Sequence, residues 1–167
     1  MPAPLLFASE GQINAVVPAD APSEGQAFVR VIVDGVASEE IPVEMQRSAP
    51  NILEVLNADG SLNSPGQPAP AQSEVTVLVT GLGVAGVTPD RIARTNRELS
   101  TEGVSVSWSS GETTEAPAIS SVRTVAGSPE GVVAVSFPVT PGESSLFIKI
   151  ALGDSQPAYF SVYVAEP

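Results

Sequence analysis

Ile13-Asn14-Ala15-Val16-Val17-Pro18 opens the stretch that decides the fold, which reaches from Gln12 to Met45. It is followed by a proline turn, an apolar run over 28–33, the turn Asp34-Gly35 and a last apolar run. The same order of parts returns, loosely, from Val132 to Val164. Short strands separated at regular spacing by proline and glycine turns are typical of immunoglobulin-like β-sandwiches. The sequence therefore predicts an all-β protein with two such units in tandem.

The two copies differ in what precedes them. Apolar alternation over 75–79 and again over 104–108 comes before the second copy, whereas nothing equivalent precedes Leu5. We therefore expect a first unit over 1–47 that lacks its opening strands, a connector over 48–72, and a complete second sandwich over 73–167. A sheet that lacks a strand presents unpaired backbone N–H and C=O groups. The first unit is thus expected to pack on the second, or to pair with another chain or a second copy through its open edge.

Composition excludes several classes of function. The 167 residues carry a formal net charge of −12, and nucleic acid is a poor partner for such a chain because phosphate binding needs clustered lysine and arginine. Histidine and cysteine are absent, which removes the commonest general base, the thiol nucleophile and the usual zinc ligands. No apolar run approaches the ~20 residues that span a bilayer. We expect no cofactor and no membrane insertion.

Thr88-Pro89-Asp90 carries the strongest helix-start signal of the chain and predicts one short helix near 89–99. On such a helix Arg91, Arg94 and Arg97 share one side, and they are three of the seven basic residues. Two interpretations of this patch are open. It is a candidate binding site for an acidic partner or an anionic glycan, or it is a solvated helix face that neighbouring carboxylates balance, which is the usual role of charge runs at a surface.

The connector contains alternating polar residues of the kind that calcium loops use. Asn57, Asp59 and Asn63 could supply oxygen ligands, so they form a candidate metal site. No glutamate stands at the closing position, however, and calcium takes six to eight oxygens. The alternative interpretation is a series of turns, because Asp59-Gly60 suits a tight turn.

Catalytic motifs are missing from the sequence. Lys149, the single lysine, lies within an apolar strand pattern, and no GxSxG motif is present. The neighbouring carboxylates Glu39 and Glu40 would point to opposite faces of a strand, so they could not converge on a substrate. Trp108 continues a valine stripe and is predicted to lie in the core. The protein is therefore not expected to be an enzyme.

Two motifs carry a resemblance to a known family. Residues 5–18 (LLFASEGQINAVVP) resemble the recurring opening of the Solibacter-type C-terminal domain, and residues 56–65 (LNADGSLNSP) followed by Thr80-Gly81-Leu82-Gly83 resemble its central signature. That family occurs at the ends of secreted proteins from Acidobacteria. The resemblance implies an extracellular, immunoglobulin-like module with no assigned activity. Glu10 departs from the usual proline, and the Arg91–Arg97 segment replaces a loop rich in proline and alanine.

Two classes of function remain open from the sequence. The first is a non-catalytic structural or interaction module at the C-terminus of a secreted or cell-surface protein, serving adhesion, docking or export. Its partners would be upstream domains of a larger polypeptide, since the strand pattern is already under way at Leu5, or another chain. The alternative is a module that binds extracellular polysaccharide.

Overall fold

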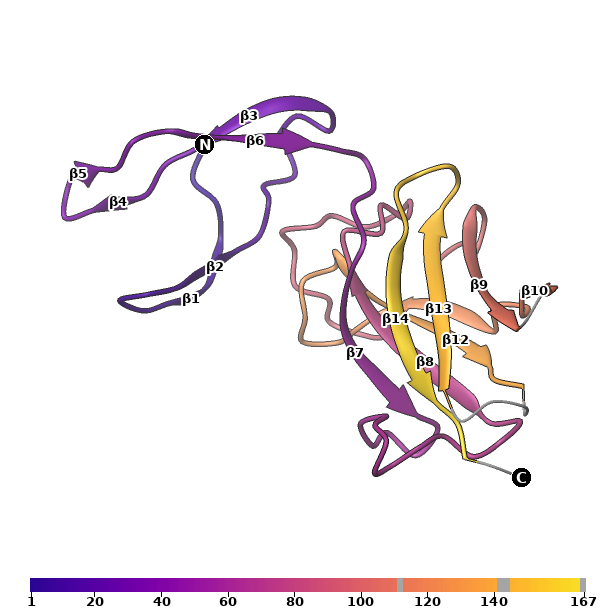
Figure 1. Ribbon diagram of the computed structural model, residues 1–167. Coiled ribbons are helices and arrows are strands. Elements are labelled where there is room, and N and C mark those ends of the chain that lie inside the picture. The colour runs from indigo at the N-terminus through magenta and orange to yellow at the C-terminus, as the bar shows by residue number, and fades with distance from the viewer. Residues whose placement is uncertain (111–112, 141–144, 166–167) are drawn as a thin grey trace. The chain divides into compact units, whose positions relative to one another are not determined.

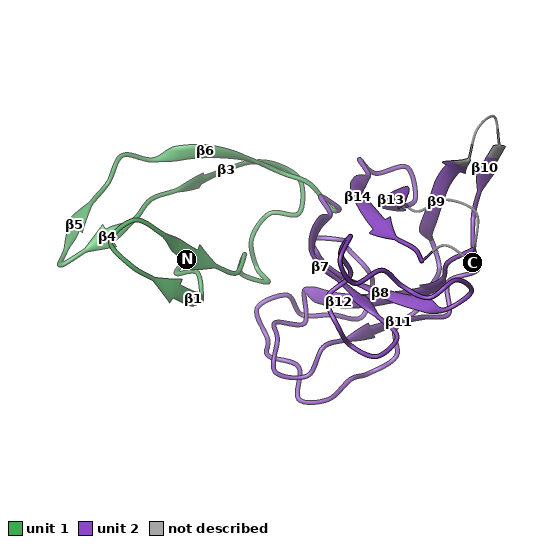
Figure 2. Ribbon diagram, turned by 60° about the horizontal axis from the view of Figure 1, so that its bottom comes forward, with its two compact units in different colours: residues 1–47 green, residues 48–167 purple. Residues whose placement is uncertain are grey.

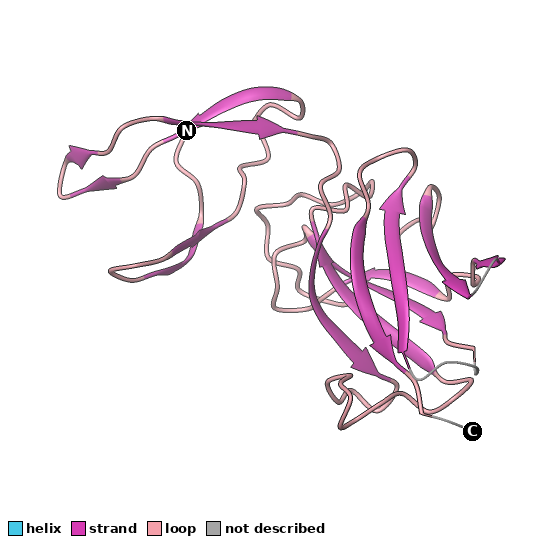
Figure 3. Ribbon diagram, in the orientation of Figure 1, coloured by secondary structure: helices cyan, strands magenta, loops and turns pink. Residues whose placement is uncertain are grey.

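The computed structural model describes residues 1–110, 113–140 and 145–165 (Figure 1). Every regular element in these residues is a β-strand, which confirms the all-β prediction (Figure 3). No helix in the described part of the chain has the length and hydropathy that crossing a membrane requires. The chain divides into two compact units, unit 1 (Met1–Arg47) and unit 2 (Ser48–Pro167), shown in green and purple in Figure 2.

Unit 2 contains two four-stranded antiparallel sheets. One has the order β11-β12-β8-β7 and is built from β7 (Asn51–Asn57), β8 (Glu74–Thr80), β11 (Ser121–Thr124) and β12 (Val132–Pro138). The other has the order β10-β9-β13-β14 and is built from β9 (Val104–Ser110), β10 (Thr113–Glu115), β13 (Ser145–Leu152) and β14 (Ala158–Tyr163). The chain changes sheet three times, between β8 and β9, between β10 and β11, and between β12 and β13. The architecture is consistent with a β-sandwich.

One hydrophobic core lies between these sheets. Alternate residues of β8 and β13 are buried, as expected for strands with one face inward. Val77, Phe137, Ile148 and Ile150 are fully buried members of one cluster that draws on both sheets. Trp108 on β9 belongs to the same cluster with 3% of its surface exposed, which confirms its predicted place in the core.

The segment over 48–72, expected as a connector, contributes β7 to the first sheet of unit 2. The pairing of β7 with β8 shifts register between Ile52 and Glu54, so the strand carries a bulge. Such a bulge interrupts the alternation of inward and outward residues, which is the signal that marks β8 in the sequence. The later part of the 48–72 segment forms turns. It also makes an isolated parallel bridge, in which Ala69 pairs with Val164, the residue that follows β14.

The helix predicted near 89–99 is wrong. Thr88 accepts a hydrogen bond from the Arg91 backbone N–H, which gives a turn, but the chain then pairs with residues 123–130. Backbone bridges join Ile92 to Pro129 and Glu98 to Arg123. Capping signals are local and worth about 1 kcal/mol, whereas these backbone bonds form with a segment some thirty residues away in sequence. Long-range pairing therefore overrides the local preference.

Unit 1 consists of three separate two-stranded antiparallel sheets. These are β1 (Leu5–Ala8) with β2 (Ile13–Ala15), β3 (Gly25–Val29) with β6 (Ile41–Met45), and β4 (Ile32–Val33) with β5 (Val36–Ala37). None of its 47 residues is buried. Isolated two-stranded hairpins are marginally stable in water at best, because they bury too little apolar surface.

The repeated stretches allow strand-by-strand comparison of the units. In unit 2, β13 pairs with β14 on one edge and with β9 on the other, and β12 likewise has two neighbours. In unit 1, the corresponding strand β3 pairs with β6 alone, and β2 pairs with β1 alone. Unit 1 therefore has the pairing of the last two strands of unit 2 without the additional strand beside it.

Candidate functional site

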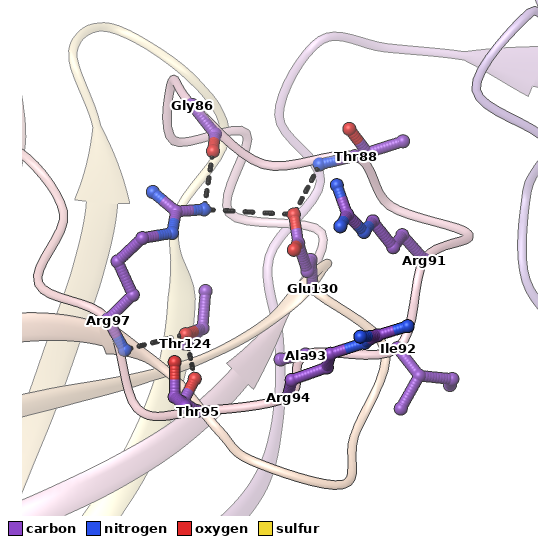
Figure 4. Close-up of a pocket in the computed structure, with 10 residues that line it drawn as sticks. All are labelled: Gly86, Thr88, Arg91, Ile92, Ala93, Arg94, Thr95, Arg97, Thr124 and Glu130. Atoms are coloured by element: carbon purple, nitrogen blue, oxygen red, sulfur yellow. Dashed lines mark hydrogen bonds and ion pairs between the residues drawn. The ribbon is translucent and has the colours of Figure 1, made fainter.

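The three arginines singled out from the sequence line one pocket of unit 2, although no helix presents them. This arginine pocket has a volume of about 340 Å³ and lies against the loop over 86–97 and the segment around Thr124 and Glu130 (Figure 4). Arg91 and Arg97 extend towards Glu130 in Figure 4, whereas Arg94 lies lower, beside Ile92. The fold thus gathers cations and one carboxylate around a single concavity.

Arg97 is fixed in place by the surrounding loop. Its Nη2 donates to the carbonyl oxygen of Gly86 at 2.7 Å and lies 3.7 Å from Oε2 of Glu130. The same Glu130 oxygen accepts the Thr88 backbone N–H at 3.0 Å. Glu130 is the better shielded partner, with 12% of its side chain exposed against 48% for Arg97. This network joins the two ends of the loop, so Arg97 serves chiefly to hold the pocket's shape.

Thr124 links the loop to the sheet through two hydrogen bonds of its hydroxyl group. Its hydroxyl oxygen accepts the Arg97 backbone N–H and donates to the carbonyl oxygen of Thr95, both at 2.9 Å. Thr124 lies on β11 and is 1% exposed, so the loop is anchored to a rigid strand. Buried hydroxyls with both a donor and an acceptor partner are fully satisfied. The pocket wall is accordingly preformed.

Arg91 and Arg94 differ from Arg97 in their electrostatic surroundings. The ion pairs in the described residues join Arg30 to Glu40, Arg47 to Glu24 and Arg97 to Glu130. Neither Arg91 nor Arg94 takes part in one, and both are exposed. Their guanidinium groups therefore add positive charge to the pocket, and none of these three ion pairs neutralises that charge.

Sequence reasoning missed Glu130, Thr88 and Thr124 as parts of this site. Glu130 lies 42 residues after the Thr88 N–H that it accepts, and Thr124 lies 27 residues after Arg97. No local pattern links positions so far apart. The one available signal was the clustering of three arginines within seven residues, in a chain of net charge −12.

The other predicted site, Asn57, Asp59 and Asn63, forms a hydrogen-bonded turn. Asn57 is buried, and its amide nitrogen donates to the Ser61 hydroxyl and to the carbonyl oxygen of Gln67, both at 3.0 Å. Hydrogen bonds from the Ser61 hydroxyl and then from its backbone N–H lower the pKa of Asp59. The described residues hold no cluster of three or more histidine, cysteine, aspartate or glutamate side chains. These hydrogen bonds explain the turn as a structural link, and metal binding there stays a prediction.

Asn63 connects this turn to the last strand. Its Nδ2 donates to Oδ1 of Asn57 at 2.9 Å and to the Tyr163 carbonyl oxygen at 2.8 Å, and its Oδ1 accepts the Tyr163 N–H at 2.8 Å. We expect Asn63→Ala to lower the free energy of unfolding by about 2–3 kcal/mol, since each such bond contributes ~1 kcal/mol. Urea denaturation followed by Trp108 fluorescence measures this.

A matched control is Asn51→Ala, which removes an exposed asparagine from β7. We expect its free energy of unfolding to stay within about 0.5 kcal/mol of the wild type. Equal effects of the two substitutions would contradict a special role for the Asn63 link.

Exposed apolar side chains are concentrated in unit 1. Thirteen of the eighteen exposed large apolar residues in the described chain lie there, including Phe7, Phe28, Ile32 and Val36. Unit 2 has one exposed aromatic pair, Phe147 and Tyr159, whose rings stack at 5.5 Å between centroids. Contiguous exposed apolar surface marks interaction sites more often than a scatter of single residues does.

Comparison of the chain with protein-family models, curated proteins and solved structures finds no match.

Proposed function

We propose that this chain is a non-catalytic, immunoglobulin-like interaction module of a secreted or cell-surface protein, and that unit 1 binds extended segments of another polypeptide. The observation that carries the proposal is that unit 1 has open strand edges and no buried residue. The partner would supply neighbouring strands and cover the apolar faces. Adhesion, docking and export are functions that such a contact serves.

The immunoglobulin-like part of the proposal is supported by unit 2. In that fold a sheet of strands A, B, E and D packs on a sheet containing C, F and G, with a buried tryptophan on strand C. Taking β7 as strand A and β8 as strand B gives the order D-E-B-A for one sheet and places F and G at β13 and β14. Trp108 then lies on strand C and is buried. The resemblance of two sequence motifs to the Solibacter-type C-terminal domain supports the extracellular setting.

Strand addition fits the chemistry of unit 1. The free edge of β3 offers backbone donors and acceptors in a row, and an incoming strand would pair with them as β9 pairs with β13 in unit 2. Phe28 on β3 is 60% exposed and Ile41 on β6 is 64% exposed, so added strands would also bury apolar side chains. At about 25 cal/mol per Å² of apolar surface, such burial provides the main driving force.

A second candidate function, binding of extracellular polysaccharide, is favoured by the arginine pocket. Ligand sites are concave and preformed, with a few polar groups converging on the ligand. The pocket has these properties, and it lies within unit 2. The two candidates use different surfaces and can coexist.

Hydrogen exchange of the full chain, with light scattering over a dilution series, tests the interaction proposal. In dilute monomer we expect the amides of β3 and β6 to exchange much faster than those of β8 and β12, because hairpins open at little cost in free energy. A monomer whose unit 1 is as well protected as unit 2 would sink the proposal. If the chain self-associates, protection should rise at β3 and β6 first.

Phe28→Ser and Phe147→Ser form a matched pair for this test. Both remove an exposed phenylalanine from a strand, in unit 1 and unit 2 respectively. Where self-association is found, Phe28→Ser should weaken it and Phe147→Ser should leave it unchanged. The opposite ranking would place the interface on unit 2.

A further inference from the structure

We propose that the arginine pocket binds a sugar acid through its single carboxylate, with Arg91 and Arg94 holding that group and Ile92 lying against the sugar ring. The inference is independent of the interaction proposed for unit 1, because every residue of the pocket lies in unit 2. It rests on the polysaccharide-binding candidate only in the choice of a sugar as the ligand.

The charge of the pocket is opposite to that of the protein. Three of the seven basic residues line it together with one carboxylate, whereas the chain as a whole has a net charge of −12. A local positive potential in a concave site concentrates anions. Arg97 is already bound to Gly86 and Glu130, so Arg91 and Arg94 are the cations that a ligand can engage. The guanidinium fork matches a carboxylate with two parallel hydrogen bonds.

The backbone around these arginines is held firmly. The carbonyl oxygen of Arg91 accepts the Glu130 N–H at 2.7 Å. The Ala93 N–H donates to the carbonyl oxygen of Ser128, and the Ala93 carbonyl oxygen accepts the Gly127 N–H, both at 2.9 Å. Ala93 is also 3% exposed, which anchors the loop in the interior between the two arginines. A site whose backbone is fixed before binding loses less conformational entropy when the ligand arrives.

The size and lining of the pocket suit a sugar-sized ligand. Its volume of about 340 Å³ lies at the small end of ligand sites, which span roughly 300–1,000 Å³. Ile92, which is 49% exposed, offers an apolar surface to the C–H face of a ring, and the exposed threonines 88 and 95 bring hydroxyl groups for polar contacts. This mixture fits a ring bearing hydroxyl groups better than a purely apolar acid.

A single carboxylate is favoured over a long polyanion by the charge of the protein outside the pocket. Glu130 is already paired with Arg97, so the two remaining arginines are left for one carboxylate of the ligand. The chain as a whole has a net charge of −12, so repulsion from the protein outside the pocket grows with the charge and length of the ligand. A long polyanion is therefore disfavoured relative to a ligand that bears one carboxylate.

Titration calorimetry of the full chain with galacturonate tests the proposal. We expect saturable binding that weakens with added salt, and little or no binding of galactose or acetate. Digalacturonate separates two sources of the ligand: tighter binding than galacturonate indicates the end of a polysaccharide chain, and equal binding indicates the free acid. Acetate or galactose binding as well as galacturonate would overturn the choice of ligand.

The variants Arg91→Gln and Arg94→Gln test the assigned residues. Each should weaken galacturonate binding roughly tenfold or more, as expected when a charge-assisted contact is lost. Lys149→Gln is the matched control, because it removes one positive charge from an exposed position of unit 2 outside the pocket lining, and its affinity should match the wild type. Unchanged thermal unfolding of all three variants separates lost binding from lost folding.

Absence of saturable galacturonate binding, or equal weakening in Lys149→Gln, overturns the pocket assignment. Neither result would bear on unit 1, whose exchange and association are measured separately.

Discussion

Replacement of Phe137 by alanine is expected to lower the free energy of unfolding of unit 2 by about 3–5 kcal/mol, the usual cost of truncating a buried phenylalanine. Phe137 is fully buried on β12, which has β8 on one side and β11 on the other. Phe137 lies opposite Val75 of β8, which is also fully buried, and such close-packed surroundings relax only partly into the cavity that its removal leaves. Urea denaturation monitored through Trp108, the single tryptophan and a member of the same core, measures the loss.

Phe147→Ala is the control for that experiment. Phe147 has the same side chain on β13, but 64% of it is exposed and its ring stacks on that of Tyr159. Loss of an exposed aromatic pair should cost about 1 kcal/mol or less. Similar losses for the two phenylalanines would contradict a core centred between the sheets.

Gly81→Ala is expected to cost about 2–4 kcal/mol, the second largest effect. Gly81 follows β8 with a φ of 70°, which side chains other than that of glycine adopt only with strain. An added Cβ would also collide with the backbone carbonyl oxygen of Ala49. That backbone is held in place, because the Ala49 N–H donates to the Gly81 carbonyl oxygen and the Ser48 hydroxyl to that of Leu82, both at 2.8 Å.

Gly60→Ala separates the two causes. Gly60 has a similar φ of 82°, but a Cβ there would meet nothing within 4 Å. We expect it to cost about 1 kcal/mol from the backbone conformation alone, so the excess for Gly81→Ala measures the collision. Urea midpoints of both variants give the comparison, and equal values would show that the chain before β7 yields freely.

Strands with strict alternation could be predicted from the sequence. The valines at 75, 77 and 79 are all fully buried on β8, and Val106 and Trp108 are buried on β9, as the patterns indicated. A two-residue period reports directly on which face of a strand is covered. β7 escaped prediction because its bulge between Ile52 and Glu54 breaks that period.

The arginine site was predictable only in part. Spacing brought Arg91, Arg94 and Arg97 to attention, and the structure does line one pocket with them. The spacing predicts a helix, whereas pairing with the segment over 123–130 shapes the loop. Glu130, which fixes Arg97, carries no local signal because its position follows from tertiary pairing. Local patterns therefore identified the charges but not the geometry that makes them a site.

The sequence separation of the contacts sets a folding order for the two units. The hairpins of unit 1 close over short stretches of chain, whereas unit 2 joins Thr76 to Ser136, 60 residues apart, and Asn63 to Tyr163, 100 residues apart. Contacts between distant residues form slowly, because the entropy of loop closure is lost before the contacts are gained. During synthesis unit 1 therefore emerges and forms its local hairpins first, while the sandwich of unit 2 must wait for β14. The apolar strands of unit 2 are uncovered during that interval. Binding to a partner chain and aggregation then compete for the same open strand edges.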